Sequence, residues 1–200
     1  MARFRVVAGF PEALRRPAAD LYYGAFVDKL GPVLGRDGRG AAFLADIMDP
    51  QFCLCAVSDD ETRLFGIAGF KTAAGALAGG GLADLARHYG RFGALWRGIV
   101  LSLLGRATEQ GIFLLDGIAV RPEARGNGIG TALLDAIEGM AGERGFTCVR
   151  LDVIDTNGCA RALYERRGYV PVSRERLGPL GRLIGFSGAT RMEKPIAPSR

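Results

Sequence analysis

Three glycines at alternate positions follow two arginines and lead into an apolar segment, in the stretch "VRPEARGNGIGTALL" from Val120 to Leu134. Gly126, Gly128 and Gly130 carry no side chain that would keep a ligand away from the backbone. If a helix begins here, its first turn presents unpaired amides, and its dipole favours negative charge. The stretch therefore predicts a phosphate site, with Arg125 as a formal positive charge beside the amides.

Three kinds of phosphate site place glycines at the head of a helix. A P-loop needs lysine and then serine or threonine after its last glycine, but Gly130 is followed by Thr131 and Ala132. The dinucleotide fingerprint needs a third glycine where this sequence has Thr131 or Leu133. A pyrophosphate resting on the amides of the first helical turn fits the residues better.

A second group of residues lies further along, in "DTNGCARALYERRGYVPV". Asn157 is placed to cap a short helix and Gly168 to end it. Tyr164 follows Asn157 by seven residues, two helical turns on and on the same side. Each residue alone is typical of an ordinary cap or of an aromatic on an amphipathic helix.

Together the two groups resemble the GNAT superfamily of acyl-CoA-dependent N-acetyltransferases, over about Ile112 to Val172. The family signature R/Q-x-x-G-x-G/A is matched in full by Arg125, Gly126, Asn127, Gly128, Ile129 and Gly130. The resemblance implies acetyl-CoA as co-substrate and no metal, with the pyrophosphate on this turn and on Thr131. It also implies that Asn157 and Ala160 contact the pantetheine arm, and that Tyr164 lies close to the thioester sulfur.

An apolar run of strand length, "GIFLLDGIAV", precedes the glycines and contains the pair Asp116-Gly117. Such a pair is typical of a hairpin turn, but the arms here are short, and a glycine inside a strand more often marks a bulge. We expect a bulge. In the resembling family a bulge at this strand helps to separate it from its parallel neighbour, and pantetheine enters the gap. That gives backbone roles to Ile118 and Val120, with Ala119 between them.

The implied reaction is direct transfer of an acetyl group to an amine in a ternary complex. It requires a neutral amine, donors for the developing oxyanion and a proton for the departing thiolate. Tyr164 is the candidate acid, and Asp116 the candidate base, which must be buried or must act through water. The alternative is that Asp116 is a structural carboxylate at the bulge. Glu123 and Asp152 are weaker candidates for the base.

The remaining pattern predicts an α/β (α+β) fold. A strand, a glycine-rich turn, a helix and the strand "TCVRLDVI" form a βαβ-like unit with parallel strands. Earlier we expect a strand at "FRVV", helices over about 11–30 and 40–48, and a hairpin of "QFCLCAVS" with "RLFGIAGFK"; two more strands follow in the tail. The expectation is a GNAT-like mixed, mostly antiparallel six- to seven-stranded sheet, with splayed central parallel strands and flanking helices.

The segment 71–110 is longer than the resembling family needs between its third and fourth strands. Apolar residues recur there every three or four positions, which predicts one helix or two short helices interrupted near Gly90 and Gly93; they are Leu82, Leu85, Tyr89, Phe92, Trp96, Ile99 and Leu103. They form either the core face of a covering helix or an enlarged insertion lining a substrate pocket. The apolar bulk and scattered arginines favour an acceptor with apolar or acidic groups besides its amine.

Composition limits the alternatives. With 200 residues, 48% hydrophobic and 24% charged, the chain suits a single soluble domain over 1–200. A net charge of +5 favours anionic ligands, but no Lys/Arg-rich block argues for nucleic acid. Cys53 and Cys55 share one face of a predicted strand, which is typical of small buried side chains, and no C-x-x-C pair is present.

The sequence shows no signal-peptide pattern and no apolar run of about 18 residues. We therefore expect a cytoplasmic protein whose partners are acetyl-CoA and an amine acceptor, without nucleic acid or membrane; a homodimer is compatible with the sequence. The predicted function is N-acetylation of a primary amine on a small molecule, peptide or protein. The alternative from another class is a non-catalytic acyl-CoA-binding sensor or interaction module.

Overall fold

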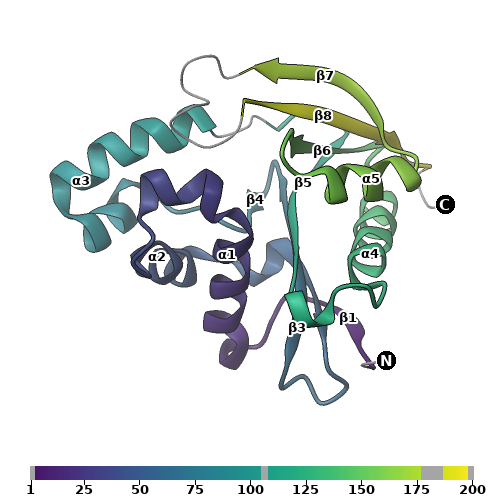
Figure 1. The fold of residues 1–200 in the computed structure, drawn as a ribbon, viewed down its shortest axis with the longest axis horizontal. Coiled ribbons are helices and arrows are strands. Elements are labelled where there is room, and N and C mark those ends of the chain that lie inside the picture. The colour runs from purple at the N-terminus through teal and green to yellow at the C-terminus, as the bar shows by residue number, and fades with distance from the viewer. Residues whose placement is uncertain (1–2, 105–107, 177–186, 198–200) are drawn as a thin grey trace.

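A single twisted sheet runs through the computed structural model, which describes residues 3–104, 108–176 and 187–197 (Figure 1). Over these ranges the sheet has eight strands: β1 (Arg5–Ala8), β2 (Cys53–Val57), β3 (Leu64–Thr72), β4 (Gly75–Ala76), β5 (Ile112–Val120), β6 (Cys148–Ile154), β7 (Val170–Arg176) and β8 (Gly188–Pro195). Their order is β1-β2-β3-β5-β6-β8-β7, and β4 pairs with β3. Only β5 and β6 are parallel neighbours, so the expected mixed, mostly antiparallel sheet is confirmed, with the two-residue β4 in addition.

Helices cover both faces of this sheet: α1 (Arg15–Leu34), α2 (Arg39–Ile47), α3 (Leu82–Leu104), α4 (Ile129–Glu143) and α5 (Gly158–Arg166). The first three lie on one face, and α4 and α5 lie on the other (Figure 1). Short 3-10 turns precede α1, β2 and α4, at Glu12–Leu14, Pro50–Phe52 and Pro122–Ala124.

The residues of β2 alternate between the two hydrophobic clusters that flank the sheet. Cys53, Cys55 and Val57 belong to the cluster under α1, α2 and α3, whereas Leu54 and Ala56 face α4. This alternation follows from the two-residue period of a strand. The two cysteines are buried side chains on one face, as the sequence predicted.

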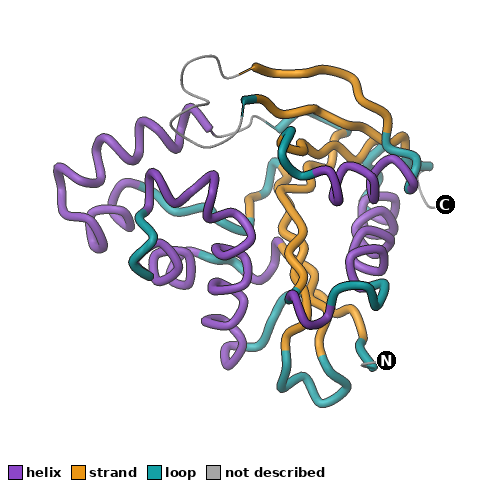
Figure 2. The backbone as a smooth tube through the Cα atoms, in the orientation of Figure 1, coloured by secondary structure: helices purple, strands orange, loops and turns teal. Residues whose placement is uncertain are grey.

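The expected bulge lies at Asp116. In the antiparallel ladder with β3, Gly117 pairs with Gly69 and Leu115 with Phe70, so Asp116 is the extra residue. The parallel pairing of β5 with β6 covers only Ile112–Leu114 and ends just before the bulge. A bulge bends its strand and increases the local twist. Beyond it β5 continues beside β3, while β6 stays with β8, so the two parallel strands separate (Figure 2).

The first helix differs from its prediction. It ends at Leu34 rather than near Leu30, and Pro32 lies inside it. Proline removes one helical hydrogen bond, which is why Gly31-Pro32 resembles a helix end. Val33 and Leu34 are buried just beyond it, and their packing offsets this loss.

Helix α3 is interrupted at Gly90, whose φ of 68° and ψ of 168° are not helical. The expected interruption near Gly90 is therefore present, and of the two alternatives for the apolar residues the structure does not have the single buried core face. Leu85 is buried, whereas Phe92 is 92% exposed, and Leu82, Trp96 and Ile99 are exposed as well. The non-helical residue changes the direction of the chain, so one periodic pattern does not correspond to one buried face. The side chain of Leu103 lies outside the described residues.

None of the helices in the described ranges has the length and apolar character that a membrane crossing requires.

Two phenylalanines test this division between core and surface. Phe70 is fully buried between Phe52 and Phe113, with ring centroids 5.9 and 4.7 Å away. Phe70→Ala should lower the free energy of unfolding by about 3–5 kcal/mol, since it leaves a cavity. Phe92→Ala should change it by less than about 0.5 kcal/mol, because the ring is exposed. Urea denaturation measures both, and equal losses would contradict the placement of α3.

Candidate active site

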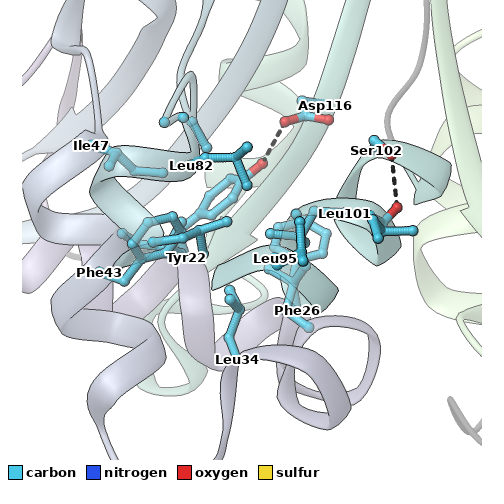
Figure 3. Close-up of a pocket in the computed structure, with 18 residues that line it drawn as sticks. Tyr22, Phe26, Leu34, Phe43, Ile47, Leu82, Leu95, Leu101, Ser102 and Asp116 are labelled. Carbon is cyan, nitrogen blue, oxygen red and sulfur yellow. Dashed lines mark hydrogen bonds between the residues drawn. The ribbon is translucent and has the colours of Figure 1, made fainter. Parts of the chain in front are cut away.

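The extra residue of β5 directs a carboxylate toward α1. Asp116 is exposed, and its Oδ2 accepts a hydrogen bond of 3.2 Å from the hydroxyl of Tyr22 (Figure 3). Tyr22 is 4% exposed, and burial together with the charge of Asp116 raises the pKa of its phenol well above the ordinary value. The phenol therefore stays a neutral donor that holds the carboxylate in place.

Between the separating strands lies a cavity of about 250 Å³, here called the strand cleft. Its walls are residues 114–118 of β5 and 151–154 of β6, and Phe26 of α1 and Tyr164 of α5 also line it. It brings together five of the residues singled out in the sequence, which are Asp116, Ile118, Asn157, Ala160 and Tyr164. Beyond the short parallel ladder, both strands present backbone groups to this space that are not used in pairing β5 with β6.

Helix α5 begins and ends where the sequence indicates. Oδ1 of Asn157 accepts a hydrogen bond of 3.1 Å from the amide of Ala160, the expected N-cap interaction. Gly168, with φ of 84°, follows the last turn. The cap and the stop orient Tyr164 into the strand cleft, where its ring also contacts Tyr169 at 5.8 Å between centroids. Burial raises the pKa of Tyr164 to about 12, so its phenol is protonated at neutral pH.

The turn at the head of α4 leaves its backbone open. Gly126 and Gly128 both have φ of 78°, which L side chains rarely adopt. Apart from the glycine itself and its chain neighbours, no heavy atom of the described residues lies within 4 Å of the point where a Cβ on either glycine would stand. Gly128 is the N-cap residue and offers no side chain to the first helical amides, which belong to Ile129, Gly130 and Thr131. A ligand with anionic oxygens can approach these donors.

Two side chains donate hydrogen bonds to backbone carbonyls in and just before this turn. Nδ2 of Asn127 donates to the carbonyls of Ala124 and Arg125, at 3.2 and 3.3 Å. Nε of Arg125 donates to the carbonyl of Val120 at 3.2 Å, while the side chain remains exposed. The exposed guanidinium therefore belongs to the segment that leads into the glycine turn, and its contact with a phosphate stays a prediction.

The other predicted residues, with the exception of Asp152, lie outside the lining of the strand cleft. Ala119 is buried in the hydrophobic cluster under α1, and the carbonyl of Val120 is engaged by Arg125. Of the weaker candidates for the base, Glu123 is exposed, with an oxygen 3.8 Å from Arg121. Asp152 does line the cleft, but it forms an ion pair with Arg191 at 3.6 Å.

A second and larger cavity, here called the apolar cavity, lies between α1, α2 and α3 and measures about 640 Å³ (Figure 3). Most of its lining side chains are aliphatic or aromatic, among them Tyr22, Phe26, Leu34, Phe43, Ile47, Leu85, Leu95 and Ile99. Phe26 and Asp116 line this cavity and the strand cleft alike. The two spaces therefore border the same two side chains at the bulge of β5.

Sequence reasoning missed Tyr22 and Phe26. Tyr22 precedes Asp116 by 94 residues, and no local motif links them. On α1 both aromatics resemble ordinary core residues, and their rings contact each other at 4.7 Å between centroids. Their periodic spacing on one helix face was the only available signal.

The described part of the chain contains no group of three or more His, Cys, Asp or Glu side chains arranged to hold a metal ion.

Comparison with known proteins shows one family. Residues 32–169 match the model of the acetyltransferase (GNAT) family. An uncharacterized N-acetyltransferase of Bacillus subtilis (strain 168), YhfO, is 41% identical over 58 residues, which are 29% of this chain and 39% of that protein. The chain thus matches about two fifths of the length of this curated relative.

Solved structures share the fold at low identity. The ribosomal-protein-S18-alanine N-acetyltransferase of Escherichia coli has a TM-score of 0.60 and 16% identity, covering 99% of this chain and 97% of its own. A phosphinothricin acetyltransferase of Sinorhizobium meliloti, in complex with AcCoA, has a TM-score of 0.58 and 16% identity, covering 98% and 90%.

The raised pKa of Tyr164 predicts a loss of stability in alkali. An unfolded chain loses the phenolic proton near pH 10, whereas the native protein keeps it to about pH 12. The unfolded state then binds fewer protons, so the free energy of unfolding falls as pH rises through this window. Denaturant titrations between about pH 9 and 12 should show a smaller fall for Tyr164→Phe than for the unsubstituted protein. Identical slopes would contradict the burial of this phenol.

Proposed function

The chain belongs to the acetyltransferase (GNAT) family, and from that premise we propose that it transfers an acetyl group from acetyl-CoA to a primary amine by direct attack in a ternary complex. One observation supports this most strongly. A single carboxylate, Asp116, lines both the strand cleft and the apolar cavity. In the proposal, the cleft holds the acetyl donor and the cavity holds the amine, so the reacting groups meet beside Asp116.

The residues present fit acetyl-CoA. Its pyrophosphate needs hydrogen-bond donors and positive charge, which the open amides of 129–131 and Arg125 offer. Its pantetheine arm carries amides, which suit the backbone groups of the separating strands and the end of α5 at Asn157. A neighbour with the same fold was solved with AcCoA. When bound, acetyl-CoA supplies the activated acetyl thioester.

Asp116 serves the amine in this proposal. The C–N bond forms as the C–S bond breaks, the sulfur keeps the bonding electron pair, and the nitrogen releases one proton to water as the amide forms. Before this attack the acceptor must lose another proton, because it arrives as an ammonium group. An exposed carboxylate is a weak base toward an ammonium group, so we assign Asp116 the ordering of a water that carries this proton to solvent. Tyr22 keeps the carboxylate oriented through its hydrogen bond.

Tyr164 serves the sulfur. The pKa of the Tyr164 phenol is about 12, whereas an ordinary thiol has a pKa of about 8.5. The phenolate is therefore a stronger base than the departing thiolate, and the proton stays on the phenol. Full proton transfer to the sulfur is therefore unfavourable. We assign Tyr164 the donation of a hydrogen bond that stabilises charge on the departing sulfur.

Thiol release from acetyl-CoA with a panel of primary amines tests the reaction. Asp116→Asn should lower kcat/KM by about 100-fold or more, since it removes the group that orders the proton-accepting water. Tyr164→Phe should lower kcat by about 10- to 100-fold, the cost of losing a hydrogen bond to a charged group. If acetyl-CoA binds but no amine in the panel releases thiol, the chain is a non-catalytic sensor and the proposed reaction is wrong.

Binding of acetyl-CoA can be tested without turnover. At about 100 times its dissociation constant, acetyl-CoA should stabilise the fold by about 2.7 kcal/mol, which thermal unfolding detects. Gly128→Val should abolish this shift by placing a side chain before the open amides. Gly145→Val is the matched control, because Gly145 has φ of 76° and open space at the other end of α4. Both variants carry similar backbone strain, and a normal shift for Gly128→Val would disprove the phosphate site.

A further inference from the structure

We propose that the acceptor is a hydrophobic primary amine without an acidic group, bound with its apolar body in the apolar cavity and its nitrogen beside Asp116. This inference rests on the proposed function and narrows it to a class of substrate. It depends on the lining of the cavity, the distribution of charge around it and the two residues that it shares with the strand cleft.

The lining of the cavity suits an apolar body. Aromatic and aliphatic side chains from three helices surround it, including Phe26, Leu34, Phe43, Leu85 and Ile99. A volume of about 640 Å³ falls within the range of about 300–1,000 Å³ typical of small-molecule sites. A short polar amine would leave most of this apolar surface uncovered and would gain little from it.

The charge around the cavity distinguishes between acceptors. Among the described residues that line the apolar cavity, Asp116 is the one with a negative charge, and none is a lysine, arginine or histidine. An ammonium group therefore finds an opposite charge, whereas an acidic group on the same molecule would be buried without one. Burial of an unpaired charge is costly, so the cavity selects against acidic acceptors.

The arginines of α3 do not supply that missing charge. Arg97 packs against the rings of Tyr89 and Trp96, at 4.2 and 4.3 Å from their centroids, and donates to the carbonyl of Gly93. Arg87 forms an ion pair with Asp84. None of the three arginines of α3, which are Arg87, Arg91 and Arg97, is among the described residues that line the apolar cavity. From the sequence we expected an acceptor with apolar or acidic groups besides its amine. The cavity favours the apolar groups and disfavours the acidic ones.

The direction of binding follows from the shared residues. Phe26 and Asp116 line both spaces, so the amine nitrogen must lie at this end to reach the strand cleft. The rest of the molecule then extends along the apolar lining, to which α3 contributes the exposed residues Leu95 and Ile99. In this orientation a terminal carboxylate would be placed against α3.

A series of linear amines from ethylamine to octylamine, assayed with the full-length protein and acetyl-CoA, tests the inference. We expect kcat/KM to rise about fourfold for each added methylene until the cavity is filled. Hexylamine and 6-aminohexanoate form a matched pair that differs by the terminal carboxylate. We expect the acid to be acetylated at least about 100-fold less efficiently, since its carboxylate gives up water to lie against apolar side chains and gains no opposite charge there.

Two exposed residues of α3 give a matched pair of variants. Ile99 lines the apolar cavity, whereas Phe92 lies on the same helix outside that lining. Ile99→Gln should flatten the dependence of kcat/KM on chain length, because it places a polar side chain against the apolar body. Phe92→Gln should keep the dependence of the unsubstituted protein. Equal effects of the two substitutions would overturn the proposed direction of binding.

Calorimetric titration of octylamine in the absence of acetyl-CoA separates this inference from the proposed function. Saturable binding that Ile99→Gln weakens, without acetylation of any amine, would support the cavity assignment and overturn the proposed reaction. Efficient acetylation of ethylamine or 6-aminohexanoate, with no gain for octylamine, would support the reaction and overturn the hydrophobic acceptor. Absence of both binding and acetylation would overturn both.

Discussion

Asp116 has no residue opposite it in the ladder between β3 and β5, and the geometry of the site depends on this irregularity. The extra residue ends the parallel pairing with β6 after Leu114, which opens the strand cleft. It also turns a carboxylate toward α1, where the buried hydroxyl of Tyr22 holds it. A regular strand in the same place would keep β5 and β6 paired and would leave no common point for two substrates.

The glycine turn and the strand cleft both leave backbone hydrogen-bonding groups free to contact a ligand. At the head of α4, left-handed glycines leave amides without side chains in front of them, which suits an anion. In the cleft, separated strands leave backbone groups available for hydrogen bonds with an extended ligand. The apolar cavity differs from both, because side chains from α1, α2 and α3 define it. In the proposed reaction, donor recognition thus depends on the backbone, and acceptor choice on side chains.

Features set by neighbouring residues were predictable from the sequence. The bulge at Asp116-Gly117 and the cap at Asn157 depend on conformational preferences and hydrogen bonds within a few residues, and the structure has both. The approach of Tyr22 to Asp116 was not predictable, because it requires the packing of α1 on the sheet. Which side chains of α3 are buried was not predictable either, since the sequence left a core face and a pocket lining open and Gly90 breaks the helical period.

In the proposed reaction, donor and acceptor occupy two cavities that both border Asp116 at the bulge of β5. A crystal structure with a conjugate of CoA joined to an alkylamine through an acetyl bridge would locate both substrates at once. We expect the pyrophosphate at the amides of 129–131, the pantetheine between β5 and β6, the bridge beside Asp116 and the alkyl chain between α1 and α3. An alkyl chain that leaves the cleft without entering the apolar cavity, or a pantetheine outside the gap between the two strands, would contradict it.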